Sequence, residues 1–208
     1  MWVPNKGSYV WALSKAVPDG RVIAFEPQLV LAEYLRTACR VSGLKNVIIE
    51  TAGCSDIATA LPLAIPGHGA SSPGASFERA VAEREPCRFI TVQTVVLDEY
   101  FAEESGHIGA IKIDVEGHEL SVLRGAMNVI NRHKPVIVCE CEQRHLTHGV
   151  VTDVIRFVQA MGYDAYFCQG TKLTPVDRFV PSVHQKQNGK RFWDARDYYN
   201  NFVFYPLA

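Results

Sequence analysis

Residues 111–126, with the sequence IKIDVEGHELSVLRGA, constrain the fold more than any other part of the chain. A short apolar strand leads directly into Asp114, Glu116 and a glycine, and apolar residues with helical spacing follow it, at Leu120, Leu123, Met127 and Ile130. A strand that passes at once into a helix is typical of a parallel βα unit, and ligands bind at the carboxyl ends of such strands. Asp114 and Glu116 are therefore the first candidates for functional residues.

Strand-like and helix-like segments alternate along the rest of the chain. The patterns predict helices at 7–16, 29–41, 97–101 and 152–161, and strands at 21–25, 47–51, 89–94, 135–142, 163–168 and 202–205. This order predicts an α/β fold with a mostly parallel sheet. The 208 residues fit one domain, and no repeat or linker divides them, so we expect a single domain over 1–208.

One segment, residues 62–86, interrupts this alternation because it is rich in proline, glycine and serine. Long loops within a domain are usually functional or disordered. Two interpretations remain open: a floppy surface insertion, or a mobile lid over a ligand. Residues 52–56, before it, are expected to form a turn.

Composition excludes several classes of function. The net charge of −1 argues against nucleic acid and membrane surfaces as partners. No apolar run approaches the roughly 20 residues that span a bilayer, and the first residues do not resemble a signal peptide. Six cysteines without a C-x-x-C pair indicate core residues in a reducing cytoplasm, and their spacing predicts no metal site.

Four stretches, taken in order, resemble the FkbM family of S-adenosylmethionine (SAM)-dependent methyltransferases. They are 5–9 (NKGSY), 22–27 (VIAFEP), 52–56 (AGCSD) and 111–126, and the ending NNFVF at 200–204 fits as well. The resemblance runs from Asn5 to Phe204. It implies a Rossmann-like SAM-methyltransferase fold, with an antiparallel strand near the C-terminus.

The resemblance also implies SAM as cofactor. A carboxylate at the tip of the strand that ends in Glu26 and Pro27 can accept hydrogen bonds from both ribose hydroxyls. Gly7 begins a helix whose N-terminus favours the cofactor's carboxylate. The residues expected at the cofactor are Asn5, Gly7, Ser8, Glu26, Pro27, Ser55, Asp56 and Asp114. The alternatives stay open: Glu26 as a surface or capping residue, Gly7 as an ordinary helix start, and Asp56 as a turn residue.

The chain departs from the family at its beginning. Relatives have an apolar strand and a loop of the form Asp-x-Gly-Ala-Asn-x-Gly, where this sequence has only residues 3–7 (VPNKG) and the first strand is missing. Either the natural protein is longer, or the sheet closes up or borrows a strand from a partner chain. We expect this 208-residue form to bind SAM poorly. Exposed strand edges would favour a homodimer.

Methyl transfer to a hydroxyl requires a group that removes the proton. Glu116 is our first candidate for this base, His118 on the first turn of the next helix is the second, and Asp114 lies beside them. Each has a structural alternative, because acids also cap helices. Further acids are Glu140 and Glu142; an ion pair of Lys112 with Glu140 would make that pair structural. Glu119 is expected to be a structural helix residue, and His145 and His148 to be exposed loop residues or acceptor contacts.

Together these observations predict a cytoplasmic SAM-dependent methyltransferase that acts on a hydroxyl of a small molecule or saccharide. A degenerate, non-catalytic family member that acts in protein interaction is the alternative. A nicotinamide-dependent oxidoreductase ranks last, because the sequence lacks an intact G-x-G-x-x-G.

Overall fold

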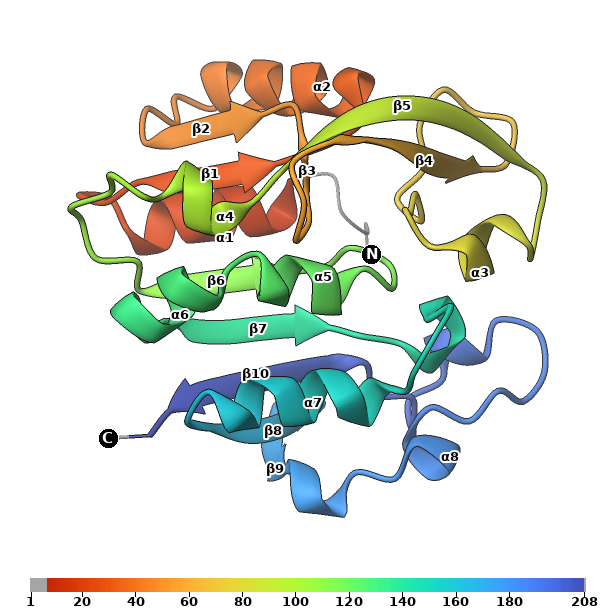
Figure 1. Ribbon diagram of the computed structural model, residues 1–208. Coiled ribbons are helices and arrows are strands. Elements are labelled where there is room, and N and C mark those ends of the chain that lie inside the picture. The colour runs from red at the N-terminus through yellow and green to blue at the C-terminus, as the bar shows by residue number, and fades with distance from the viewer. Residues whose placement is uncertain (1–6, 208) are drawn as a thin grey trace.

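The computed structural model describes residues 7–207, and three sheets organise them. The largest has the order β6 (Ala110–Ile113), β7 (Val136–Glu140), β10 (Asn201–Pro206), β8 (Tyr163–Gln169) and β9 (Lys172–Pro175). A parallel pair, β1 (Val22–Phe25) and β2 (Val47–Glu50), lies beyond β6, and β3 (Gly53–Cys54), β5 (Cys87–Val95) and β4 (Ala60–Pro66) form a third sheet (Figure 1).

The sheets are mixed, so the prediction of a mostly parallel sheet was wrong. Among residues 7–207 three strand pairs are parallel (β1–β2, β3–β5 and β6–β7) and four are antiparallel (β4–β5, β7–β10, β8–β10 and β8–β9). The predicted antiparallel strand near the C-terminus is confirmed as β10, between β7 and β8. The β4–β5 and β8–β9 hairpins were not predicted. The sequence did not predict β4 because it contains Pro62 and Pro66, which are disfavoured in central strands. As an edge strand, β4 tolerates them.

The sheet is interrupted between β1 and β6. Within the described residues β1 pairs only with β2, β6 pairs only with β7, and no strand precedes α1 (Ser8–Ala16). The described residues therefore leave β1 and β6 without a strand paired between them. Side chains of α4 (Leu97–Tyr100) connect the two parts. The Tyr100 ring packs edge-on against Phe25 at 5.0 Å and its hydroxyl donates to Glu50, while Asp98 accepts hydrogen bonds from the backbone N–H groups of Asn128 and Val129.

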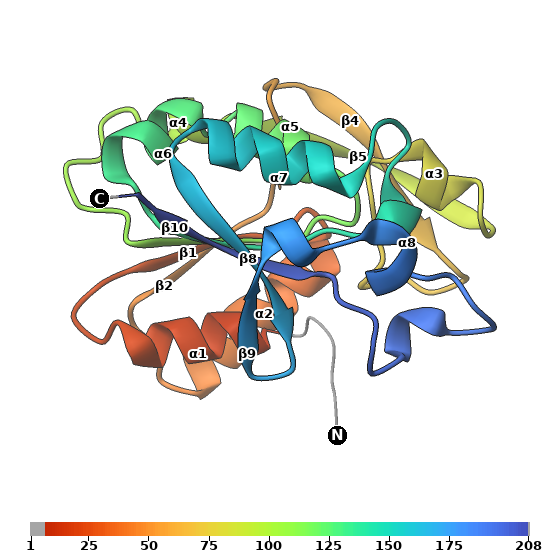
Figure 2. The same ribbon diagram turned by 90° about the horizontal axis from the view of Figure 1, so that it is seen from below.

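The main core lies on one face of the large sheet. The helices α5 (Glu119–Arg124), α6 (Met127–His133) and α7 (Val151–Ala160) cover this face, and α1 and α2 (Leu29–Val41) lie on the opposite side (Figure 2). Strand residues alternate between the faces, so Phe202 and Phe204 both point into the core. The other buried members include Ile113, Leu123, Ile137, Val158 and Phe167. Burial of each such side chain stabilises the fold by roughly 1.5–3 kcal/mol.

Close packing breaks the helix predicted after Glu116 into α5 and α6. A Cβ on Gly125 would lie 2.1 Å from the Ser55 carbonyl oxygen, so the chain bends where β3 passes. The predicted turn at 52–56 contains this short strand, which pairs with β5. The remaining short helices are α3 (Arg79–Ala82), η1 (Gln143–His145), η2 (Val176–Arg178), α8 (Pro181–His184) and η3 (Phe192–Asp194).

The six cysteines are all free. Cys39, Cys139 and Cys141 are buried, as predicted, and the other three are half-buried. The interpretation as core residues therefore holds for half of them.

Candidate active site

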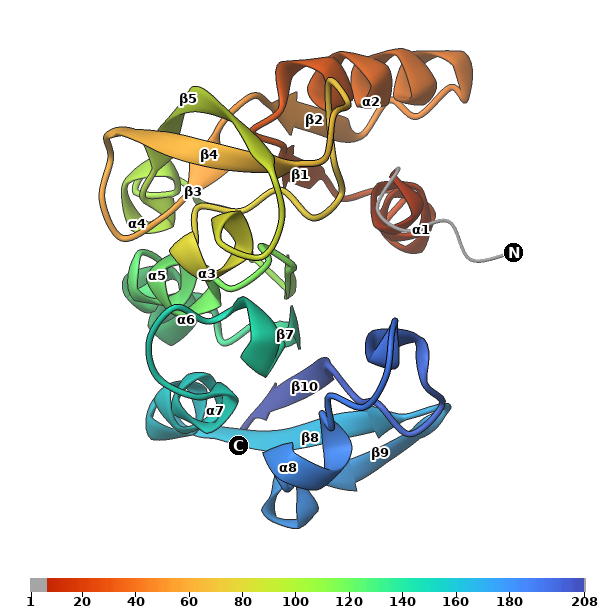
Figure 3. The ribbon, with the colours of Figure 1, turned by 90° about the vertical axis from the view of Figure 1, so that its right-hand side faces the viewer.

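The candidate site lies where β1, β6 and β7 end, on the side that faces the viewer in Figure 3. The segment between β4 and β5, which includes α3, lies in front of these strand ends. Side chains from distant parts of the sequence therefore meet at one edge, as expected for parallel βα units.

Glu26 directly follows β1, and Pro27 ends the strand. The Oε1 atom of Glu26 accepts a hydrogen bond from the backbone N–H of Gln28 at 2.8 Å. Burial raises the pKa of Glu26, although the hydrogen bonds from Gln28 oppose that rise. A carboxylate offers about four acceptor positions, so Glu26 retains capacity for two hydroxyl donors.

Lys112 stands between two carboxylates at the ends of neighbouring strands. Its Nζ lies 3.8 Å from Asp114 Oδ2 and 3.9 Å from Glu140 Oε2. The ion pair with Glu140 that we considered is thus present, but it is shared. The ring of Tyr9, from α1, lies under the same ammonium group at 5.0 Å. Lys112 therefore lies close to both acids at this corner.

Glu116 is held by a histidine from the segment after β7. Its Oε2 lies 2.7 Å from Nδ1 of His145, which is buried, so the expectation that His145 is exposed was wrong. Glu116 has a φ of 52°, and Gly117 follows with a φ of 106°. A Cβ on Gly117 would lie 2.4 Å from the His145 carbonyl oxygen, so only glycine allows this close approach. His148 is exposed, as predicted.

His118 connects β3 to the insertion. Its Nδ1 lies 2.9 Å from Glu78 Oε1, and its Nε2 lies 2.9 Å from the Ser55 hydroxyl oxygen. Burial opposes the ionisation of Glu78, but hydrogen bonds from His118 and Thr147 outweigh it and lower the pKa. The Ser55 hydroxyl therefore has two partners, His118 Nε2 and Asp56 Oδ1, to which it donates at 3.2 Å. His118 is the N-cap residue of α5 and lies just before the first turn.

The insertion at 62–86 is anchored across the site. The Gln28 side chain and the Ser72 backbone exchange two hydrogen bonds, and the Ser76 hydroxyl donates to the Glu116 carbonyl. On the far side, the backbone N–H of Ala80 donates to the Thr147 hydroxyl. These bonds attach the segment near the ends of β1, β6 and β7.

The remaining predicted residues lie in three places. Gly7 is the N-cap of α1 in a left-handed conformation, and a Cβ there would lie 2.6 Å from Leu35 Cδ2. This packing accounts for the glycine without a ligand, and Ser8 beside it is exposed. Asp56 is exposed and lies next to Ser55, which is buried. Asn5 lies outside the described residues.

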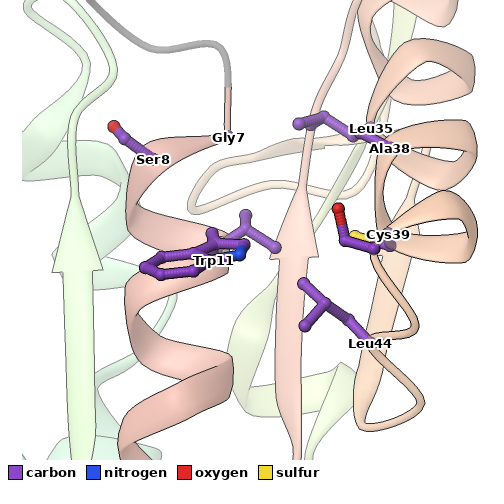
Figure 4. A pocket seen from close by; sticks show the side chains of 9 residues that line it. Gly7, Ser8, Trp11, Leu35, Ala38, Cys39 and Leu44 are labelled. Atoms are coloured by element: carbon purple, nitrogen blue, oxygen red, sulfur yellow. The ribbon is translucent and has the colours of Figure 1, made fainter.

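Two cavities flank the site without including Glu26, Asp114 or Glu116. One, of about 230 Å³, lies between α1 and α2, with Gly7, Ser8, Trp11 and Leu35 among its lining residues (Figure 4). The second, of about 410 Å³, lies on the open face of the large sheet, beside Asn200 and Tyr9. Within residues 7–207, no group of three or more histidine, cysteine, aspartate or glutamate residues is arranged to hold a metal ion.

Sequence reasoning missed several of these contacts. Gln28, Ser76 and Glu78 carried no signal, because their partners lie about 40 residues away. Asn200 was noticed only as part of the chain ending, yet it donates to Glu140 at 2.8 Å and to Glu142 at 3.1 Å. The signal available in the sequence was the position of these residues. Asn200 directly precedes one predicted strand, and Glu140 and Glu142 lie two residues apart at the end of another, so pairing of the two strands would bring the amide to the acids.

The fold and the site define a mixed α/β domain with acids at the ends of parallel strands, the general plan of α/β proteins that bind nucleotides and nucleosides. Residues 4–165 match the Methyltransferase FkbM domain, so the chain belongs to the FkbM methyltransferase family. No curated protein matches the sequence.

The fold is similar to the crystal structure of methyltransferase FkbM from Methylobacillus flagellatus KT, with a TM-score of 0.55 and 15% identity. The match covers 97% of this chain and 42% of the other, so this chain spans less than half of that protein. At this identity the similarity supports the fold alone. None of the helices in residues 7–207 has the length and apolar character needed to cross a membrane.

Proposed function

We propose that this chain is a SAM-dependent methyltransferase that methylates a hydroxyl group of a small molecule or saccharide. Family membership supports methyl transfer, and the observation that carries the cofactor assignment is Glu26. This half-buried carboxylate directly follows β1 with unused acceptor capacity, and its desolvation would be offset by two donor hydroxyls such as those of a ribose. The residues present therefore fit a nucleoside.

The other proposed contacts follow from the positions of their elements. Pro27 fixes the chain direction after Glu26, and Gly7 and Ser8, with Asn5 before them, would face the methionyl end at the start of α1. Ser55 and Asp56 would flank the adenine, and Asp114 would complete the site. When bound, SAM supplies a methyl group on a positively charged sulfur. The protein aligns the acceptor, and such alignment can contribute roughly 7–11 kcal/mol to the barrier reduction.

Glu116, Asp114 and His118 are the sequence-based candidates for proton removal. The structure adds that both ring nitrogens of His118 have partners and that Glu116 has His145. In this proposal His118 and His145 hold the acids and the insertion in place. The proposal includes no nucleic-acid or membrane partner and a cytoplasmic location. A homodimer would use the unpaired edges of β1 and β6.

Ligand-induced thermal shifts test the function. SAM and S-adenosylhomocysteine, titrated to millimolar concentration, should raise the melting temperature, and NAD should not. We expect weak binding, because the sheet is interrupted between β1 and β6 within the described residues. No shift with either ligand would contradict the proposal and favour the non-catalytic alternative, and a shift with NAD alone would favour an oxidoreductase.

A further inference from the structure

The open face of the large sheet carries a second group of polar residues beside the candidate site. Lys112, Val138 and Val203 are partners across β6, β7 and β10, and all lie on the face opposite the main core. Figure 3 shows α5, α6 and α7 on the core side of the sheet, and α1 and the loop before β10 on the other side.

The cavity of about 410 Å³ lies on this open face of the sheet. Its lining includes Tyr9, Val138, Cys168, Arg196, Asn200 and Asn201. Its volume falls within the range of about 300–1,000 Å³ that is usual for small-molecule sites.

Glu140 lies next to three residues that line this cavity, Val138, Asn200 and Asn201. It lies two residues after Val138 on β7, so both side chains occupy the same face. Its partner across β10 is Asn201, and Asn200 donates to its Oε1. About 20% of the Glu140 side chain is exposed, so it is accessible to a ligand in the cavity.

We infer that this cavity holds the methyl acceptor and that Glu140 is the general base that removes the proton of the acceptor hydroxyl. This inference rests on the proposed methyltransferase function and deepens it. The acceptor oxygen bonds to the methyl carbon as the carbon–sulfur bond breaks. The sulfur keeps the electron pair and becomes a neutral thioether, and Glu140 takes the proton and later releases it to water.

The charges around Glu140 prepare it for this role. Burial, and then the nearby Asp114, raise the pKa of Glu140 to about 7, although Lys112 opposes the rise. A base is most effective when its pKa is near the working pH. The titratable and charged groups that face Glu140 are Lys112 from β6, Asp114 and Glu116 from the loop after it, Glu142 beyond β7, and Tyr9 from α1. Glu116, in contrast, is already paired with Nδ1 of His145 at 2.7 Å.

The lining indicates a neutral molecule with several hydroxyl groups, such as a sugar. Asn201 donates to the Asn200 side-chain oxygen at 2.9 Å, which leaves the Asn201 carbonyl oxygen as an acceptor for a hydroxyl. Tyr9 offers an aromatic ring against which an apolar sugar face can pack. Asp114 and Glu140 place two carboxylates beside Lys112 at this corner, which disfavours a negative charge near the base, although Arg196 also lines the cavity.

Acceptor binding is tested by NMR titration of the isotope-labelled full chain. The probes are methyl glucoside, methyl galactoside and methyl mannoside as neutral sugars, glucuronate as an anion, and catechol as a planar phenol. We expect at least one neutral sugar to shift the signals of Tyr9, Cys168 and residues 196–201, and Asn201→Ala to weaken its binding by about tenfold. Preference for glucuronate or catechol, or shifts elsewhere, would overturn the acceptor assignment, as would no binding.

The base is tested with Glu140→Gln, which keeps the shape of the side chain. The NMR titration of Glu140 should show a midpoint near 7, and the variant should lose this step. With the sugar that binds best, the variant should lose about 100-fold to 10,000-fold in methyl transfer and lose the neutral-pH limb of the rate profile. Its affinity for S-adenosylhomocysteine should not change, and exposed Glu103→Gln is the matched control.

The outcomes separate this inference from the function on which it rests. If the wild-type chain binds neither SAM nor S-adenosylhomocysteine, the methyltransferase proposal fails, whether or not a sugar binds the cavity. If both bind and Glu140→Gln retains wild-type turnover, or only Glu116→Gln abolishes it, the assignment of Glu140 is overturned while the function stands.

Discussion

Gln28 and Ser72 exchange two hydrogen bonds of 2.9 Å, one from the Gln28 amide to the Ser72 carbonyl and one from the Ser72 N–H to the Gln28 side-chain oxygen. Gln28 is buried two residues after Glu26, so this pair attaches the insertion to the strand end proposed to bind the cofactor. The insertion therefore lies over the site because of specific contacts.

We expect Gln28→Ala to release this part of the insertion. Two hydrogen bonds contribute about 1–3 kcal/mol together, so amide hydrogen exchange in residues 67–76 should accelerate by roughly tenfold or more. Ser72→Ala is the matched control, because it keeps the backbone groups that bind Gln28. Equal exchange in the Gln28→Ala variant and the wild-type protein would show that other contacts hold the segment.

Gly125→Ala should destabilise the protein, because its Cβ would lie 2.1 Å from the Ser55 carbonyl oxygen. Overpacking of this kind costs about 1–3 kcal/mol, and each kcal/mol lowers the melting temperature of a chain this size by about 2–4 °C. In the control Gly74→Ala, the nearest heavy atom to the new Cβ is Ser72 Oγ at 3.9 Å. Thermal unfolding should therefore separate the two variants, and equal melting temperatures would mean that β3 shifts freely.

Glu119 makes stability depend on pH. Burial raises its pKa from 4.5 to about 8, although the N–H of Gly117 donates to its Oε1. The folded state then binds more protons than the unfolded state between these values, so this contribution to stability is present at low pH and is lost as pH rises through about 8.

Glu119→Gln should remove this dependence, because the amide never ionises. Urea unfolding across this pH window should show that the variant gains stability relative to wild type as pH rises. Exposed Glu103→Gln should follow the wild-type curve. A constant difference between Glu119→Gln and wild type would mean that Glu119 is ionised throughout.

Glu26→Ala should weaken SAM binding. Hydrogen bonds to a charged group contribute about 1.5–3 kcal/mol, so the affinity should fall on the order of tenfold to a hundredfold. Glu33→Ala removes the same charge from an exposed position on α2 and should bind as wild type does. Calorimetry measures both, and unchanged affinity in Glu26→Ala would remove this residue from the proposed site.

Local sequence pattern determined most of the elements and one part of the site. The apolar spacing of residues 29–41 predicted the bounds of α2, and the runs before Glu26, Asp114 and Glu140 predicted β1, β6 and β7. These features follow from neighbours along the chain, because a helix or strand face is defined by the spacing of its own residues. The same pattern placed Asp114 and Glu116 at the ends of parallel strands.

Tertiary structure alone decided which distant groups meet there. The burial of His145 against Glu116, the bridge of His118 between Ser55 and Glu78, and the break at Gly125 all depend on segments far apart in sequence. Likewise, β4 became a strand despite two prolines because it pairs with β5 along one edge only. Such contacts arise when close packing brings separate elements together, and no local spacing encodes that arrangement.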